Sequence, residues 1–144
     1  MKERTLEIIR NANISWLSVM INGVGAGLIY GTFAYFANAK FGLESSMPAA
    51  LLQFFLSFLS TFVYVLFLEI VFKDETLSFK RKIMLTLGLE AIYTLTLVLS
   101  HYLHGTPNIL FTVLPSVVLG GGYMVLYVIW ILKHNEIKAW IKNR

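Results

Sequence analysis

A few ionisable side chains lie within or at the edge of long apolar stretches of this sequence, where such groups are rare and usually have a specific role. Glu69 and Glu90 are the only charged residues inside these stretches. An ionised carboxylate surrounded by hydrocarbon is costly, so we expect Glu90 to be neutral or paired. Asn22, at a similar depth in another apolar stretch, is its candidate partner. The pair could couple protons, contact a polar substrate or form a structural hydrogen bond between helices.

The other polar groups indicate less chemistry. Glu69 lies one helical turn before Lys73 and can bond it at the membrane surface. His101 and His104 are three residues apart but lack a third ligand nearby, so we expect them at the membrane interface without a metal. The chain has no cysteine, and we find no catalytic triad, paired carboxylates or phosphate-binding glycine loop. We therefore expect no enzymatic activity and no cofactor.

These residues must be positioned by membrane helices, because the composition is that of an integral membrane protein. The 144 residues are 57% hydrophobic and 14% charged, whereas a soluble domain has about 25% charged residues. An apolar run of about 20 residues crosses a bilayer, and its backbone groups must then bond within a helix. Four runs are long enough: 14–37, 50–72, 83–103 and 109–132. Pro48, Gly105 and Pro107 fall between them. We predict an all-α protein with four transmembrane helices.

The basic residues predict the orientation of these helices. All twelve Lys and Arg residues except Lys40 lie before the first run, between the second and third, or after the fourth. Basic residues are enriched in cytoplasmic segments, so both termini and the loop "FKDETLSFKRK" are expected inside. This places the chain in a bacterial cytoplasmic membrane as a multi-pass protein. The basic charge is explained by topology, and we expect no direct binding to nucleic acid.

The two ends of the chain have amphipathic character. Residues 1–13 form a weakly amphipathic N-terminus, and residues 133–144 form a basic tail in which Ile137, Trp140 and Ile141 share a helical face. This pattern is typical of helices that lie flat on the lipid surface, with Trp140 as the anchor. We therefore expect membrane lipids to be partners of both ends.

Glycines mark two of the predicted spans. Gly23, Gly27 and Gly31 repeat every four residues, which gives the first span a face that another helix can approach closely. That face is either packed within the monomer or the seam of a homodimer. In the fourth span, residues 120–122 are all glycine and follow Pro115, so this helix is expected to be kinked or locally unwound.

The second half of the chain resembles a family of small four-helix bacterial membrane proteins encoded beside LytTR-type DNA-binding regulators. The resemblance runs from "ETLSFKRKIMLTLGLEAIYTLTLVLSHYL" to "GGGYMVLYVIWILKHNEIKAWIKNR". It is carried by an acidic residue, a serine and a lysine after the second helix and by aromatic residues in the third and fourth helices. In this chain these are Glu75, Ser78, Lys80, Tyr93, Tyr123, Tyr127 and Trp130. Leu77 stands where the family usually has Trp.

The resemblance implies a regulatory function: the protein would sequester a cytoplasmic LytTR-type transcription regulator at the membrane and inhibit its DNA binding. The contact surface would consist of the loop and the tail. Its candidate residues are Phe72, Asp74, Glu75, Leu77, Phe79, Lys80, Arg81, Glu136, Ile137 and Trp140.

Two alternatives stay open at this point. Glu90 inside the bilayer and the glycine-rich fourth span are also typical of a small transporter, a channel or a polyprenyl-lipid flippase. A bacteriocin immunity protein has the same general composition.

Overall fold

The structure is a computed structural model that describes residues 16–142, except for the side chains at positions 69, 73, 124 and 127–142. Throughout the described range the chain is helical, with short connections and no strand. Its elements are α2 (Trp16–Asn38), the 3-10 helix η1 (Ala39–Phe41), α3 (Leu43–Lys73), α4 (Phe79–His104) and α5 (Ile109–Lys142). The predicted all-α class is therefore confirmed, while the amphipathic N-terminus 1–13 lies outside the described residues.

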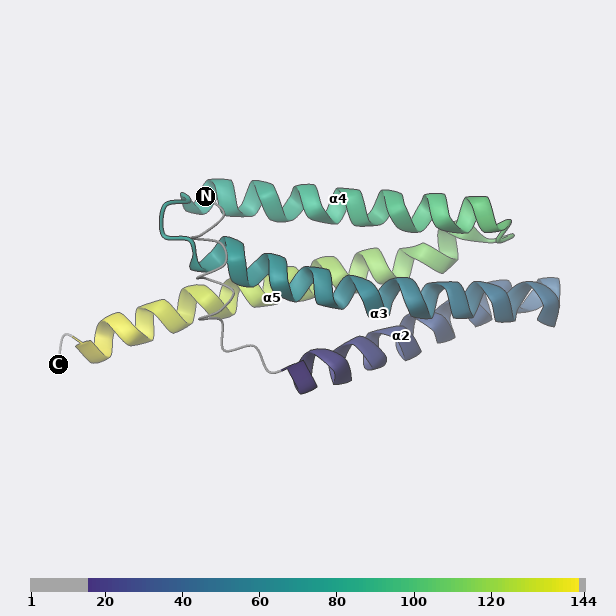
Figure 1. Cartoon of the computed structure of the whole chain (residues 1–144), viewed down its shortest axis with the longest axis horizontal. Coiled ribbons are helices and arrows are strands. Elements are labelled where there is room, and N and C mark those ends of the chain that lie inside the picture. The colour runs from purple at the N-terminus through teal and green to yellow at the C-terminus, as the bar shows by residue number, and fades with distance from the viewer. Residues whose placement is uncertain (1–15, 143–144) are drawn as a thin grey trace.

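Successive helices run antiparallel, as Figure 1 shows. In the described part, α2 packs against α3 and α5, α4 packs against the same two helices, and α2 and α4 do not touch each other. One end of the bundle carries η1 and the connection between α4 and α5, and we call it the η1 end. The opposite end carries residues 74–78 between α3 and α4, and we call it the loop end.

Three helices are long and apolar enough to cross a membrane: Trp16–Phe41, Leu43–Phe72 and Phe79–Leu103. The apolar part of α5 that the structure describes in full, Ile109–Tyr123, is shorter. The backbone of α5 is helical without interruption to Lys142. The glycines at 120–122 therefore do not unwind the helix, and no helix break separates the predicted span 109–132 from the predicted tail 133–144. Pro115 is accommodated inside the helix.

Pro48 does not lie between two helices, contrary to the sequence-based expectation. It is inside α3, which begins at Leu43, and the chain breaks instead at Gly42, whose φ of 90° favours glycine. Proline is tolerated here because it lies near the start of the helix and removes one backbone donor, the partner of the Glu44 carbonyl. The expected span began at 50 because residues 44–46 are polar, although they already belong to the helix.

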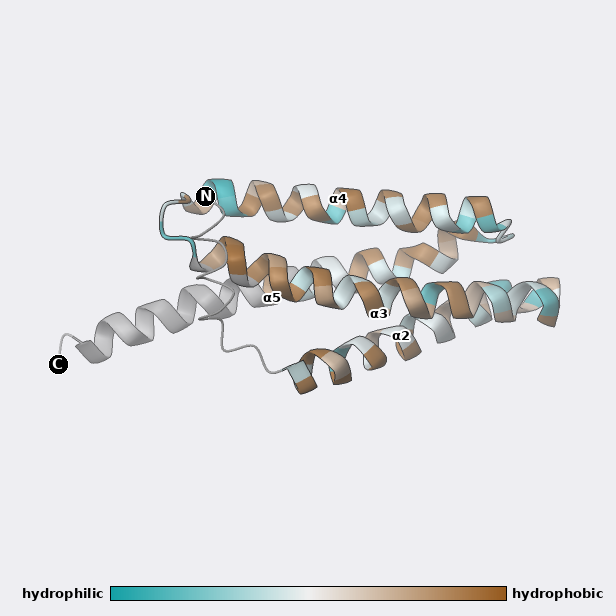
Figure 2. Ribbon diagram, in the orientation of Figure 1, coloured by the Kyte–Doolittle hydropathy of each residue, from teal (hydrophilic) through white to brown (hydrophobic). Residues whose placement is uncertain are grey.

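The interior of the bundle is more polar than its surface, the reverse of a water-soluble protein. Large apolar side chains such as Leu28, Phe36 and Leu103 are exposed, and Figure 2 shows hydrophobic residues along the outer faces of the helices. The buried polar residues are Asn38, Ser46, Gln53, Ser57, Thr86, His101, Thr106, Thr112 and Ser116. This distribution suits a bundle surrounded by lipid, which solvates apolar side chains and leaves polar ones to bond each other.

The glycine stripe of α2 faces α3 within the same chain. A Cβ added to Gly27 would lie 2.8 Å from the ring of Phe54 and 3.0 Å from its carbonyl oxygen. A Cβ added to Gly31 would lie 3.0 Å from the Ala50 carbonyl oxygen, and one on Gly23 would press on Phe58. The stripe is thus used for close packing of α2 on α3, the first of the two interpretations given above.

Gly27→Ala should therefore destabilise the bundle, because the new methyl group meets both a ring and a backbone oxygen of α3. We expect a loss of about 1–3 kcal/mol, typical of overpacking in a tight contact. Gly25→Ala is the matched control, since a Cβ at Gly25 has no atom within 4 Å. Unfolding in detergent, followed by circular dichroism, measures both. Equal stability of the two variants would contradict the packing described here.

Candidate functional site

Two polar stripes meet inside the bundle. On α3, Gln53, Ser57, Ser60, Thr61 and Tyr64 follow one another at intervals of three or four residues, which places them on one helical face. On α4, Thr86, Glu90, Tyr93 and His101 share a face in the same way. Because α3 and α4 are antiparallel neighbours, Gln53 lies opposite His101 and Tyr64 lies opposite Glu90.

In the half of the bundle nearer the η1 end, a closed hydrogen-bond network joins three helices. The Gln53 side-chain oxygen lies 2.7 Å from His101 Nε2, and its nitrogen donates to Ser116 Oγ at 2.7 Å and to Ser57 Oγ at 3.2 Å. His101 Nδ1 lies 2.9 Å from Thr106 Oγ1. An amide oxygen only accepts, so His101 carries its proton on Nε2 and Nδ1 accepts from the threonine.

A second set of bonds joins α2 to α5 at the η1 end. Asn38 is fully buried and donates to Thr112 Oγ1 at 2.8 Å and to the Ala34 carbonyl at 2.8 Å. Its side-chain oxygen accepts from the Asn108 backbone at 3.0 Å, and the Asn108 side chain donates to the Ala37 carbonyl at 2.9 Å. The η1 end is thus held together by polar contacts between the first and last described helices.

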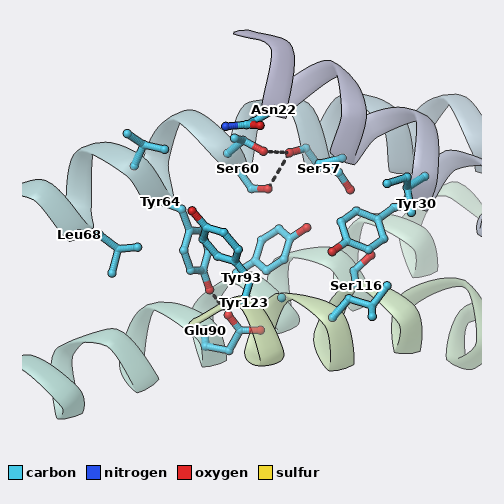
Figure 3. Close-up of a pocket in the computed structure, with 16 residues that line it drawn as sticks. Asn22, Tyr30, Ser57, Ser60, Tyr64, Leu68, Glu90, Tyr93, Ser116 and Tyr123 are labelled. Carbon is cyan, nitrogen blue, oxygen red and sulfur yellow. Dashed lines mark hydrogen bonds between the residues drawn. The ribbon is translucent and has the colours of Figure 1, made fainter. Parts of the chain in front are cut away.

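Toward the loop end the polar interior opens into a cavity of about 450 Å³. All four long helices contribute to its wall, as Figure 3 shows. The polar side chains that line it are Asn22, Tyr30, Ser57, Ser60, Thr61, Tyr64, Glu90, Tyr93, Ser116 and Tyr123. Ser57 and Ser116 also belong to the Gln53 network, so the network forms one end of the cavity.

Glu90 is the acidic residue of this cavity. One carboxylate oxygen accepts a hydrogen bond from the Tyr64 hydroxyl. The other, Oε1, is buried and has no partner within the described residues. It lies against α5 where glycine leaves room for it: a Cβ on Gly120 would be 3.7 Å from Oε1. The site therefore contains a carboxylate that is half satisfied.

Glu90 is bonded differently from the prediction. The proposed partner Asn22 lines the same cavity, but Figure 3 shows it on the opposite side, and the bond is made by Tyr64 instead. Equal depth along two helices did not bring the side chains together, because α2 and α4 are not in contact. The Glu69 side chain lies outside the described part.

The two histidines also have different environments. His101 is fully buried in the Gln53 network, so its predicted place at the membrane interface is wrong, whereas His104 is exposed. The network supplies the partners that a buried imidazole needs. Among the residues that the structure describes, no group of three His, Asp or Glu side chains could hold a metal ion.

The charged loop is a compact pair of helix caps. Asp74 Oδ1 accepts bonds from the Thr76 backbone at 2.9 Å and from its hydroxyl at 2.5 Å. Ser78 caps the start of α4, and Lys82 donates to the Phe72 carbonyl at the end of α3, 2.8 Å away. The lysine thus neutralises carbonyls that the helix end leaves unpaired.

The predicted partner-binding residues divide into three groups. Glu75, Phe79, Lys80 and Arg81 are exposed at the loop end, whereas Phe72, Asp74 and Leu77 are partly buried. The side chains of Glu136, Ile137 and Trp140 lie outside the described residues, although their backbone is helical in α5.

Sequence reasoning missed most of the cavity. Gln53, Ser57, Tyr30 and Tyr64 were not singled out, because hydroxyl and amide side chains are common in membrane helices. The signal was present in their spacing: the polar positions of α3 recur with helical period over eleven residues, from 53 to 64.

No protein-family model matches this chain, and the searches of curated proteins and of solved structures give no match. The resemblance to the LytTR-associated family therefore rests on the residues quoted for it. The fold and the site define a class instead: a helical bundle with a lipid-compatible surface, a polar interior and a cavity at an acidic residue.

Gln53→Leu tests the network that closes this interior. The change leaves His101 and Ser116 without their partner on α3, which should lower the free energy of unfolding by about 1–3 kcal/mol. A double-mutant cycle with His101→Leu should give a non-additive result, because the two residues bond each other. Thr96→Val is the control, since Thr96 is exposed and bonds only its own helix. Additive losses in detergent unfolding would show that the bond contributes nothing.

Proposed function

We propose that the protein is a small membrane carrier whose substrate site is the cavity around Glu90. Its helices would cross the bacterial cytoplasmic membrane four times, with both termini and the loop end in the cytoplasm, as the basic residues predict. The observation that carries the proposal is the buried Glu90 Oε1, which faces a cavity and has no partner in the described part of the chain. An intramembrane acidic residue is costly to keep, and binding a substrate gives it a role.

The cavity is difficult to explain as a by-product of packing. Protein interiors are close-packed, with few voids much larger than a water molecule. A cavity of about 450 Å³ falls instead within the range of about 300–1,000 Å³ that is common for small-molecule sites. Its wall combines apolar side chains such as Ile29 and Leu119 with a few polar groups that could orient a substrate.

The packing of the helices also suits a carrier. The glycine stripe joins α2 and α3 into one closely packed pair, and the cavity lies between this pair and the helices α4 and α5. Movement of one pair against the other would open the cavity first toward one side of the membrane and then toward the other. Such rocking of two units around a central site is a common mechanism of alternating access.

Cysteine labelling tests the carrier proposal, and the natural chain has no cysteine to remove. Ala26→Cys on α2 and Thr61→Cys on α3 place thiols in the cavity wall. A charged methanethiosulfonate reagent, which does not cross lipid, should label both variants in right-side-out and in inside-out membrane vesicles, because the cavity opens to each side in turn.

Leu28→Cys and Phe55→Cys are the matched controls on the same two helices. Both side chains are exposed on the apolar surface and neither lines the cavity, so lipid should protect them from the reagent. Labelling of the cavity positions from one side only would exclude a carrier, and no labelling from either side would exclude a water-accessible site.

A second candidate is the sequestration of a cytoplasmic LytTR-type regulator, favoured by one observation at the loop end. Phe79 is 49% exposed at the first residue of α4, next to exposed Lys80 and Arg81. Asp74 and Ser78 fix the conformation of the preceding loop. An aromatic side chain with adjacent charges on a rigid loop is a reasonable contact for another protein.

Affinity purification from solubilised membranes tests this candidate. The wild-type protein should retain a LytTR-type regulator, and Phe79→Ala should reduce the recovered amount, because it removes the aromatic contact. Met84→Ala is the control on the same helix, since Met84 is an exposed apolar residue of the span. Equal recovery with Phe79→Ala, or no regulator with the wild type, would exclude contact through this loop.

A further inference from the structure

The four long helices each place one tyrosine in the wall of the Glu90 cavity. These are Tyr30 from α2, Tyr64 from α3, Tyr93 from α4 and Tyr123 from α5. Figure 3 shows the four rings grouped on one side of the cavity together with the Glu90 carboxylate. The rings of Tyr64 and Tyr93 pack edge to face, with centroids 5.9 Å apart and planes at 80°. A carboxylate within an aromatic wall is an unusual arrangement for an apolar bundle.

The charge of this wall has one sign. Glu90 is the charged side chain that lines the cavity, and no Lys, Arg or His is among its described lining residues. Tyr64 donates to one carboxylate oxygen, but a phenol carries no positive charge. The buried Oε1 still lacks a donor among the described residues. The missing component of the site is therefore a positive charge or a strong donor, which a ligand would bring.

The aromatic rings indicate what kind of cation fits. The face of an aromatic ring attracts a cation, and the attraction grows when both are removed from water, as for quaternary ammonium groups in aromatic cages. A metal ion would need several charged or oxygen ligands to replace its water shell, and the described part of the chain offers no cluster of three acidic or histidine side chains. An organic cation keeps its own apolar substituents and needs only one counter-charge.

We propose that the Glu90 cavity binds a monovalent organic cation, with the Glu90 carboxylate as the counter-charge and the tyrosine rings as the aromatic wall. The proposal rests on the carrier function given above and names the substrate class of that site. The apolar lining from Ile29, Val65, Leu68 and Leu119 accommodates the hydrophobic substituents of the cation. Ser60, Thr61 and Ser116 supply hydroxyl groups at the wall for any polar substituent.

The test uses two probes of the same shape and opposite charge: tetraphenylphosphonium and tetraphenylborate. Isothermal titration of the full-length protein in detergent should show binding of tetraphenylphosphonium and not of tetraphenylborate. Glu90→Gln should weaken tetraphenylphosphonium binding by about tenfold or more, because the counter-charge is lost. Glu90→Asp, which keeps the charge on a shorter side chain, should retain part of the affinity. Tetraethylammonium is the smaller probe for the same site.

Glu44→Gln is the matched control, because Glu44 is an exposed acidic residue at the η1 end and does not line the cavity. It should bind tetraphenylphosphonium as the wild type does. Size-exclusion profiles and thermal unfolding establish that Glu90→Gln is folded. If Glu90→Gln does not fold, Tyr93→Leu replaces it and should weaken binding through the loss of one ring.

Three results would overturn the cation proposal: no binding of either cation, equal binding by wild type and Glu90→Gln, or tetraphenylborate binding as tight as that of the cation. These outcomes are distinct from a failure of the carrier function. If the cavity cysteines are labelled from both sides but no cation binds, the carrier stands and its substrate is of another class. If the cation binds but the cysteines are labelled from one side only, the site stands and the carrier does not.

Discussion

The constraint on which this structure depends is that polar groups inside a lipid-compatible bundle must bond each other. A water-soluble protein can leave a hydroxyl or an amide at its surface, but here the surface consists of large apolar side chains. Gln53, His101, Asn38 and Thr112 are fully buried, and each has partners on another helix or connection. These bonds fix the register of α3 against α4 and of α2 against α5, and the apolar contacts follow from that register.

Against this background the Glu90 site is the exception, and the exception indicates function. Near the η1 end each buried polar side chain is satisfied, whereas at the cavity a carboxylate oxygen stays unpaired and a space of about 450 Å³ stays open. An interior that bonds its other polar groups has no structural need for an acidic residue at this point. The bound state of a positively charged ligand would complete the site in the way that the Gln53 network is already complete.

Two features of the bundle separate its rigid parts from the part proposed to move. Gly23, Gly27 and Gly31 bring α2 within backbone contact of α3, so these helices behave as one unit. The gap between α2 and α4 is filled by no direct contact in the described chain, and the cavity lies beside it. The loop end is closed by caps, through Asp74, Ser78 and Lys82, which keeps α3 and α4 joined while the cavity wall changes shape.

The sequence by itself determined the helical class, three membrane-compatible helices, the glycine stripe and the importance of Glu90. These follow from local properties: apolar run length, helical period and the cost of a charge in lipid. Only the tertiary structure decided that Tyr64 rather than Asn22 bonds Glu90, that His101 is buried beside Gln53, and that four tyrosines from four helices surround one carboxylate. The physical reason is that helix rotation and neighbour order set which side chains meet, and neither is encoded in the depth of a residue along its own helix.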